Sequence, residues 1–306
     1  MSNEVQVNRN GKQAYPNVPQ LLVNQKLIQS NAYSLWLDDL EASTGLILFG
    51  GVNTEKYHGS LSSLPIAKYQ GQSAPSEFII AMTGLISDDG NKNQTVALDS
   101  TIDVLLDSGS SLSYLPDDTA SALFDMFDAK YDSKSQAAYV PCSLANSPGT
   151  LDFVFTDPTI SVPLNELVIN PGPRSDGSIL TFQDGSAACI FGISNSGDST
   201  NVLGDTFLRS AYVVYDLDNN QISLAQTNFN STKDNIKEIT TGPNSVPDTT
   251  GVSGVANAIP TQSGGRVGSP TQVPGGSIKG HAATLQVPPS MIVFFIGMFG
   301  SLFLYF

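Results

Sequence analysis

The most informative stretch of this chain reads Leu105-Leu106-Asp107-Ser108-Gly109-Ser110-Ser111-Leu112. An apolar strand is expected to run directly into Asp107, and Gly109 allows the backbone to turn sharply after it. The Ser110 hydroxyl and nearby backbone N–H groups can donate hydrogen bonds to the carboxylate, which keeps it ionised and oriented. Because Asp-Ser-Gly also occurs in ordinary turns, its meaning depends on the rest of the chain.

Segments on both sides of this stretch follow a family pattern. Val202-Leu203-Gly204-Asp205 lies downstream, followed by Tyr212-Val213-Val214-Tyr215-Asp216. Upstream lies Gly45-Leu46-Ile47-Leu48-Phe49-Gly50-Gly51. Together with the aspartate motif, these segments resemble the pepsin-like aspartic proteases over Tyr15 to Phe229. In detail they are similar to the yapsins and to the candidapepsin-like proteases of yeasts that carry a glycosylphosphatidylinositol (GPI) anchor.

This resemblance implies a role for each residue of the motif. Asp107 is the expected catalytic carboxylate. The strand through Leu203 and Gly204 is expected to cross the loop that holds it. The residues expected to support the active-site loop are Ser108, Gly109, Ser110, Leu203 and Gly204.

Two cysteines lie where this family has the disulfide of its second lobe, Cys142 and Cys189. In the chain-entropy model, a loop of that length stabilises the fold by roughly 4 kcal/mol. The alternative is a pair of buried free thiols, which would fit a chain that stays in the cytosol.

The fold is predicted to be mainly β, because short apolar runs are bounded by Gly, Asn, Asp and Pro. Two short helices are expected, near Pro19 to Ile28 and from Asp117 to Phe127, with Asp117 or Asp118 capping the second. The resemblance implies a pepsin-like second lobe with the end of the first lobe and the interlobe sheet. The predicted divisions are a polar leader (1–14), the end of the first lobe and interlobe segment (15–56), the carboxyl-terminal catalytic lobe (57–229), a disordered Ser/Thr/Gly/Pro stalk (230–290) and a hydrophobic tail (291–306).

The composition argues against several classes of function. The net charge of -14 and the pI near 4.3 make nucleic acid an unsuitable partner, because phosphate binding needs clustered Lys and Arg. The 2 Cys and 2 His residues are not grouped, so no metal site is expected. G-x-S-x-G, G-x-G-x-x-G and Walker patterns are also missing. We therefore expect carboxylate chemistry without a metal or cofactor.

The carboxyl-terminal region predicts attachment to a surface. Residues 230–290 contain too few large apolar groups to form a core. The uncharged stretch 291–306 would rise about 24 Å as a helix, short of the roughly 30 Å hydrocarbon core of a membrane. Small residues, a spacer and an apolar tail match a GPI-attachment signal, with Gly275 as the candidate attachment residue. The GPI lipid would then be the contact with the membrane, and a tail-anchored transmembrane helix is the alternative.

Two glycosylation sequons fit an exported protein, at Asn93 and at Asn230. The expected location is the extracellular face of the plasma membrane or the cell wall. Residues 1–14, however, lack the basic and apolar regions of a signal peptide.

The mechanism of the family needs a second aspartate, and no second D-[ST]-G-[ST] motif occurs in this chain. A lone Asp107 is expected to give little or no activity, because two carboxylates must share one water. We therefore expect Met1 to be an internal start and a missing amino-terminal lobe to be the partner. The resemblance to yapsins implies peptide or protein substrates cleaved near basic residues. Alternatives are a non-catalytic surface or wall protein that reuses the fold, and two copies associating through Asp107.

Overall fold

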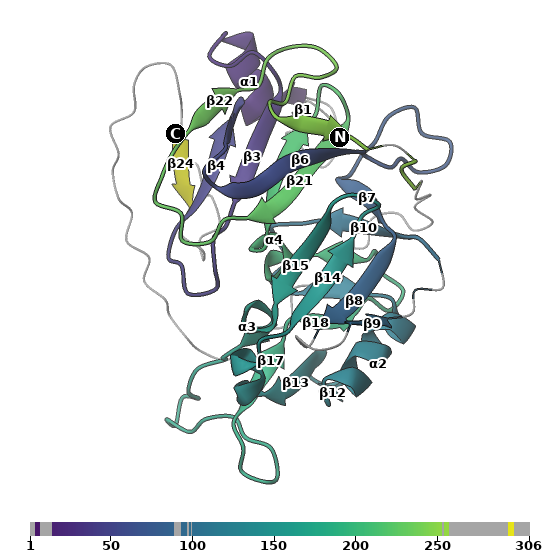
Figure 1. The fold of residues 1–306 in the computed structure, drawn as a ribbon, viewed down its shortest axis with the longest axis vertical. Helices are drawn as coiled ribbons and strands as arrows, with labels where there is room; N and C mark the ends of the chain where they lie inside the picture. Colours follow the sequence, from purple (N-terminus) through teal and green to yellow (C-terminus); the bar gives the residue numbers. More distant parts are fainter. Residues whose placement is uncertain are drawn as a thin grey trace.

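The computed structural model describes residues 4–6, 14–88, 93–96, 98, 100–252, 254–256 and 293–296. Strands dominate this part of the chain and its helices are short, which confirms the predicted mainly β fold. Figure 1 shows one large sheet in the upper part of the view and a lobe of smaller sheets below it. Near the start of the chain, β1 (Glu4–Gln6) and β2 (Ala14–Pro16) form a two-stranded antiparallel ribbon.

The large sheet has the strand order β23-β6-β21-β20-β3-β4-β24. Its strands are β3 (Ala32–Trp36), β4 (Gly45–Phe49), β6 (Tyr57–Pro65), β20 (Ala211–Asp216), β21 (Gln221–Thr227), β23 (Thr249–Gly251) and β24 (Val293–Ile296). Neighbours run antiparallel, except that β23 runs parallel to β6. Strands far apart in the sequence, such as β3 and β20, therefore pair directly.

Both faces of the large sheet are buried around β20. Val213 and Tyr215 belong to the core of the lower lobe, whereas Tyr212 and Val214 belong to a second core on the opposite face. Successive side chains of a strand point to opposite faces, so a strand buried on both faces needs an unbroken apolar run. Residues 211–215 of β20 meet this requirement, and every residue of the strand is buried, including Asp216 at its end.

Three smaller sheets build the lower lobe. The first has the order β18-β11-β19-β10-β7, the second β12-β13-β17-β16 and the third β15-β14-β8-β9. The strands of the first sheet are β7 (Ile79–Met82), β10 (Ile102–Leu106), β11 (Ser113–Leu115), β18 (Ile193–Asn195) and β19 (Val202–Leu203). Those of the second are β12 (Lys130–Asp132), β13 (Ala137–Pro141), β16 (Val168–Ile169) and β17 (Ala188–Phe191). Those of the third are β8 (Gly84–Asp88), β9 (Asn93–Val96), β14 (Thr150–Val154) and β15 (Thr159–Pro163).

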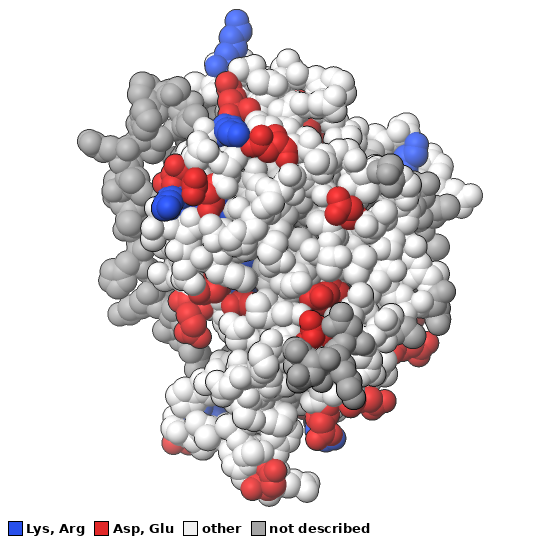
Figure 2. All heavy atoms as spheres, viewed as in Figure 1, with Lys and Arg blue, Asp and Glu red and all other residues white. Residues whose placement is uncertain are grey.

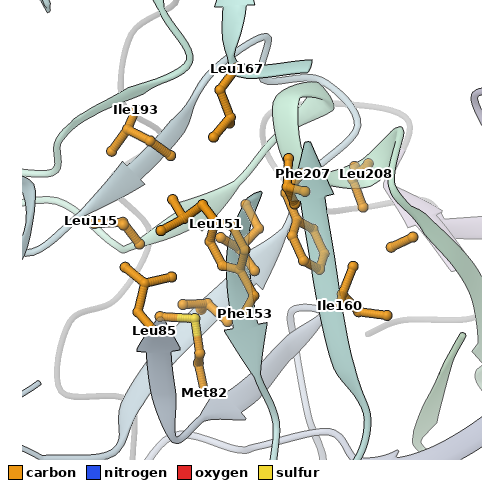
Figure 3. Close-up of a cluster of buried hydrophobic side chains, with 14 of the residues drawn as sticks. Met82, Leu85, Leu115, Leu151, Phe153, Ile160, Leu167, Ile193, Phe207 and Leu208 are labelled. Carbon is orange, nitrogen blue, oxygen red and sulfur yellow. The ribbon is translucent and has the colours of Figure 1, made fainter. Parts of the chain in front are cut away.

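The core of this lobe, shown in Figure 3, collects side chains from several of these elements. Leu85, Leu151 and Phe153 come from the third sheet, and all three are fully buried. The ring of Phe153 contacts that of Phe207, with the ring centroids 5.0 Å apart. Phe207 follows the aspartate-supporting strand β19, so the core directly underlies the candidate site.

The helices of the described part are α1 (Val18–Asn24), α2 (Asp117–Met126), α3 (Leu164–Leu167), α4 (Asp205–Leu208) and the 3-10 helix η1 (Cys142–Asn146). Helices α1 and α2 confirm the two predicted helices, although α1 ends earlier than expected. The predicted cap of α2 is wrong, because Pro116 occupies the N-cap position without a side-chain bond. Asp117 is already helical, and its Oδ1 accepts a hydrogen bond from the Gly197 backbone N–H (3.0 Å).

Cys142 and Cys189 form a disulfide bond, which confirms the predicted pairing. The bond connects the start of η1 to β17. Strand β13, which ends just before η1, also pairs with β17. The covalent bond and the hydrogen-bonded ladder therefore hold the same two segments together.

Residues 236–251 correct the predicted boundary of the stalk. Strand β22 (Ile236–Glu238) pairs with β5 (Gly51–Asn53), and β23 pairs with β6. Ile239 and Val246 are buried in the second core. The segment is too polar to form its own core, but strands at a sheet edge offer unpaired backbone groups that such a segment can use. Residues 257–290, including Gly275, lie outside the described residues.

The predicted hydrophobic tail is described only at β24, which pairs with β4. The other residues of 291–306 lie outside the described part of the chain. Where the structure is described, no helix combines the length and the apolar character required to cross a membrane.

Acidic side chains prevail over basic ones, with 28 Asp and Glu against 14 Lys and Arg. On the face shown in Figure 2, the acidic groups are dispersed, and some lie beside a Lys or Arg. The described ion pairs include the exposed pairs Lys130–Asp128 and Lys237–Asp248. The remaining excess of negative charge favours the approach of cationic molecules.

Candidate active site

Asp107 lies at the point where β10 ends and the chain turns. Its side chain is partly exposed. The Ser110 hydroxyl donates to Oδ2 (2.9 Å), and the Gly109 backbone N–H donates to Oδ1 (3.1 Å). Hydrogen bonds to the charged form stabilise it and fix the direction of the carboxylate. Two of the three predicted turn residues therefore contact the carboxylate, whereas Ser108 is exposed on the turn.

The short strand β19 passes between the two arms of the Asp107 loop. Strand β10 pairs with it in parallel, with Leu106 opposite Leu203, and β11 pairs with its other side. The Asp107 backbone N–H donates to the Leu203 carbonyl oxygen (3.1 Å). The structure thus contains the crossing that the family resemblance implied, and this crossing ties the loop to a buried strand.

Gly204 is the point of closest approach in this crossing. A Cβ atom at this position would lie 2.3 Å from the carbonyl oxygens of both Ser110 and Leu112. The contact continues at the next residue, since the Asp205 backbone N–H donates to the Ser110 carbonyl oxygen (2.8 Å). Only a residue without a side chain lets both arms of the loop close around β19.

Aromatic rings pack beside the end of β10. The Leu106 backbone N–H donates to the carbonyl oxygen of Phe78 (3.0 Å), and the Phe78 ring contacts Tyr215 with centroids 4.5 Å apart. Tyr215 stacks on Tyr33 at 4.8 Å. Burial raises the pKa of Tyr215 well above its ordinary value, and the charges of Tyr33 and Asp107 add to this effect. An aromatic cluster centred on the buried Tyr215 therefore lies within electrostatic reach of Asp107.

Asp205 is a second acidic group that interacts electrostatically with Asp107, and sequence reasoning did not assign it to the site. Burial raises the pKa of its carboxyl group from the ordinary 3.8 to about 6, while the Arg209 charge opposes the shift and the Asp107 charge adds to it. The sequence carries one signal that could have assigned Asp205 to the site. It directly follows Leu203 and Gly204, the residues predicted to cross the Asp107 loop.

Comparison with known proteins agrees with this geometry. The family described as eukaryotic aspartyl protease matches residues 3–227. This chain belongs to that family. The resemblance to pepsin-like aspartic proteases inferred from the motifs is thereby confirmed, since the match includes both the Asp107 loop and the strand that crosses it.

Several similar proteins come from fungi. A probable aspartic-type endopeptidase opsB from Aspergillus oryzae is 53% identical over 297 residues, which covers 94% of this chain and 59% of the relative. Secreted aspartic protease 1 from Candida albicans is 39% identical over 222 residues, covering 71% of this chain and 50% of the relative. Aspartic proteinase 3 from Saccharomyces cerevisiae is 37% identical over 252 residues, covering 81% and 41%. The chain thus spans about half the length of the curated relatives it matches.

A solved aspartyl protease structure has the same fold. The crystal structure of the aspartic proteinase from Irpex lacteus aligns with a TM-score of 0.56 at 21% sequence identity. The alignment covers 74% of this chain and 66% of that chain. At this identity the likeness supports the arrangement of strands and helices alone.

The acidic groups whose pKa is raised by burial predict a stability that falls as the pH rises. Asp205 has a pKa of about 6 in the folded chain against an ordinary value of 3.8, so between these values the folded state binds more protons than the unfolded state. The stabilisation is complete below the ordinary value and is lost as the pH rises through about 6. One pKa unit corresponds to about 1.4 kcal/mol, so Asp205 contributes on the order of 3 kcal/mol at most. Urea unfolding at a series of pH values measures this effect.

The variant Asp205→Asn is the control for this prediction, because it should remove much of the pH dependence. Burial also raises the pKa of Glu166 and of Asp103, which acts in the same direction. Exposed aspartates whose pKa is lowered by hydrogen bonds from their own turns act in the opposite direction: Asp132, Asp176 and Asp184. A free energy of unfolding that rises across this pH range would contradict the raised pKa of Asp205.

Proposed function

We propose that this chain is the carboxyl-terminal part of an aspartic endopeptidase in which Asp107 is one of two catalytic carboxylates. The observation that supports this best is the partly exposed carboxylate at the end of a buried strand, oriented by Ser110 and Gly109. Leu203 and Gly204 hold the loop from the inside of the lobe. Membership of the aspartyl protease family and the opsB relatives support the same assignment.

The proposed reaction is hydrolysis of a peptide bond by one water molecule held between two carboxylates. The first carboxylate removes a proton from the water as its oxygen attacks the peptide carbonyl carbon. The second carries a shared proton, hydrogen-bonds the carbonyl oxygen and protonates the leaving amine as the C–N bond breaks. Asp107 is suited to face such a water. Asp205 takes no part in this step, because it begins helix α4 in the strand–helix junction that supports the loop.

The second carboxylate is proposed to lie on an amino-terminal lobe. The longer relatives support this, since the chain covers only 59% of the Aspergillus oryzae protein. Residues 15–56 would then end the first lobe and complete the interlobe sheet, with 57–229 as the catalytic lobe. The pairing of β3 with β20 favours one sheet shared by these two segments. On its own the chain would have little activity, because one carboxylate cannot perform both proton transfers.

The proposed substrates are secreted or cell-surface peptides and proteins, cleaved near basic residues. Three observations favour this setting. The Candida relative is named a secreted protease, the disulfide suits an oxidising compartment, and the acidic surface attracts cationic peptides.

Attachment to the cell surface is part of the proposal. Glycosylation is proposed at Asn230, which is exposed just after the last long strand, and at Asn93, which lies in the edge strand β9. A GPI signal in 291–306 with attachment at Gly275 would hold the protein at the membrane or wall. The small-residue triplet, spacer and apolar tail of the sequence are its support.

A two-lobe form is expected to hydrolyse peptides between about pH 3 and pH 6, where two coupled carboxylates can share a proton. It can be made by joining the amino-terminal part of the Aspergillus oryzae relative to this chain. Pepstatin, an inhibitor of pepsin-like proteases, should remove the activity, and this chain alone should show no turnover above background. A folded two-lobe protein without turnover would contradict the proposal and favour a non-catalytic surface protein.

A further inference from the structure

Two buried hydroxyl groups lie behind the Asp107 loop, those of Ser113 and Thr206. Both residues are fully buried, so their hydroxyl groups are shielded from water. A buried polar group is costly unless it is hydrogen-bonded. Alanine in place of the serine and valine in place of the threonine would fill similar space without this requirement. The bonds that the two hydroxyl groups make therefore indicate what they contribute.

The hydrogen bonds of the two hydroxyl groups can run in one direction only. Thr206 Oγ1 lies 2.9 Å from the Gly192 carbonyl oxygen, which can only accept, so the Thr206 hydroxyl donates there. Its single proton is then used, so Thr206 Oγ1 accepts from the Ser113 hydroxyl, whose Oγ lies 3.1 Å away. Ser113 Oγ in turn accepts from the Gly204 backbone N–H (3.3 Å). The result is a directed series of bonds from Gly204 through both hydroxyl groups to Gly192.

This series of bonds connects three segments of the lobe. Ser113 begins β11, Thr206 lies in α4, and Gly192 joins β17 to β18. The Gly192 carbonyl oxygen also accepts from the Ser113 backbone N–H (3.0 Å). A Cβ atom at Gly192 would lie 2.7 Å from Thr206 Cγ2, so the methyl group of the threonine packs directly on this glycine. Thr206 thus contributes both a hydroxyl group and a methyl group, and the two can be tested separately.

Gly204 is where this series of bonds meets the support of Asp107. Its neighbour Leu203 accepts the hydrogen bond from the Asp107 backbone N–H, and that bond joins two backbone groups. The Gly204 N–H is buried between the arms of the loop and finds its acceptor on a side chain, that of Ser113. Without that acceptor a buried donor would be left unsatisfied, and β19 would have to move to satisfy it. Such a movement would reach Asp107 through Leu203.

We propose that Ser113 and Thr206 are positioning residues for the hydrolysis proposed above: their hydroxyl groups hold β19 at the place where it supports Asp107. The role in hydrolysis rests on the proposed function, whereas the effect on the loop does not. A displacement of about 1 Å at a reacting group can cost about 10²-fold in rate, so a small movement of β19 is sufficient. Neither side chain is expected to contact substrate, because both are fully buried.

The variants Thr206→Val and Thr206→Ser separate the hydroxyl group from the packing. Valine keeps the shape and removes the hydroxyl group, whereas serine keeps the hydroxyl group and removes the methyl group that packs on Gly192. Amide hydrogen exchange, measured by NMR in the full chain, reports on the bonds of Gly204 and Asp107. In Thr206→Val both N–H groups should exchange about tenfold faster relative to Val213 in the large sheet. In Thr206→Ser these ratios should stay within about threefold of the wild type.

Thr227→Val is the matched control for the loss of the hydroxyl group. Thr227 is also buried, in β21 of the large sheet, and its Oγ1 atom has no hydrogen-bond partner among the described residues. The same chemical change there should leave both exchange ratios unchanged. If Thr206 acted through packing alone, Thr206→Ser would be the more disturbed variant and Thr206→Val would resemble the wild type. That order, or an acceleration that is equally large at Val213, would overturn the proposal.

A second variant keeps the test decisive if circular dichroism shows that Thr206→Val does not fold. Ser113→Ala removes the acceptor of the Gly204 N–H and leaves the Thr206 hydroxyl bonded to Gly192. Faster relative exchange at Gly204 and Asp107 in this variant supports the proposal, and unchanged exchange overturns it.

The two-lobe form then connects the loop to catalysis. Thr206→Val should lower kcat by about 10–100-fold with little change in KM, because the substrate contacts remain while Asp107 is displaced. Thr206→Ser and Thr227→Val should both stay within about threefold of the wild type. A Thr206→Val variant with fast Gly204 exchange and wild-type kcat would overturn the positioning role. A two-lobe protein that cleaves no peptide would instead count against the proposed function, and the exchange ratios alone would decide whether the hydroxyl groups hold the loop.

Discussion

Replacing Asp107 by Asn is expected to lower kcat/KM of the two-lobe form by a factor of about 10³ or more, because positioned acid–base groups commonly contribute about 10²–10⁴-fold. The amide has nearly the shape of the carboxylate but cannot accept a proton from the attacking water. The fold should persist at a cost of about 1–2 kcal/mol, since the amide N–H₂ group would meet a donor from Gly109 or Ser110. Initial rates of peptide cleavage across the acidic range, with urea unfolding, measure both effects.

Asp103→Asn provides the matched control for this substitution. Asp103 lies in the same strand, β10, and also has a partly buried carboxyl group. Its replacement makes the same chemical change four residues before the loop and should alter the rate only slightly. A folded Asp107→Asn variant that retains wild-type turnover would exclude Asp107 as a catalytic carboxylate.

Replacing Gly204 by Ala is expected to prevent folding or to lower the free energy of unfolding by about 4 kcal/mol or more, at the extreme of single substitutions. The new Cβ atom would lie 2.3 Å from two carbonyl oxygens, those of Ser110 and Leu112. Both are backbone atoms, on opposite arms of the loop that surrounds β19, so no side-chain rotation can relieve the overlap. The loop must open, which breaks the hydrogen bond from the Asp205 N–H to the Ser110 carbonyl oxygen. Urea unfolding followed by circular dichroism measures the loss.

Gly251→Ala is the matched control for this prediction. Gly251 lies in β23, and a Cβ atom there would meet nothing within 4 Å. Its free energy of unfolding should change by no more than about 0.5 kcal/mol. If Gly204→Ala unfolds at the same urea concentration as the wild type, the close crossing described above is incorrect.

Much of the site could be predicted because its central contacts are local. The carboxylate of Asp107 accepts hydrogen bonds from residues two and three positions later, Gly109 and Ser110, and the turn brings them together without help from the rest of the chain. The crossing by Leu203 and Gly204 is a contact between distant segments. It could be predicted only because the motifs resemble a known family.

The packed part of the predicted stalk could not be found in the same way. Residues 236–251 contribute two buried apolar side chains, Ile239 and Val246, and this is too few to produce a periodic pattern. Their burial depends on the edges and face of the large sheet, which strands from residues 32–65 and 211–227 build together. The low hydrophobicity of residues 236–251 therefore predicted a stalk, whereas in the structure this segment packs on a surface that the large sheet provides.

The sequence alone was sufficient for the mainly β character, the position of the Asp107 turn and the family to which the chain belongs. These depend on apolar runs, turn residues and motif order, which are properties of short segments. Only the tertiary structure brought Glu166 to Arg209 and placed Asp205 where its pKa rises to about 6. The physical reason is that an ion pair in the interior and the desolvation of a carboxyl group both require burial, and burial is produced jointly by residues far apart in the chain.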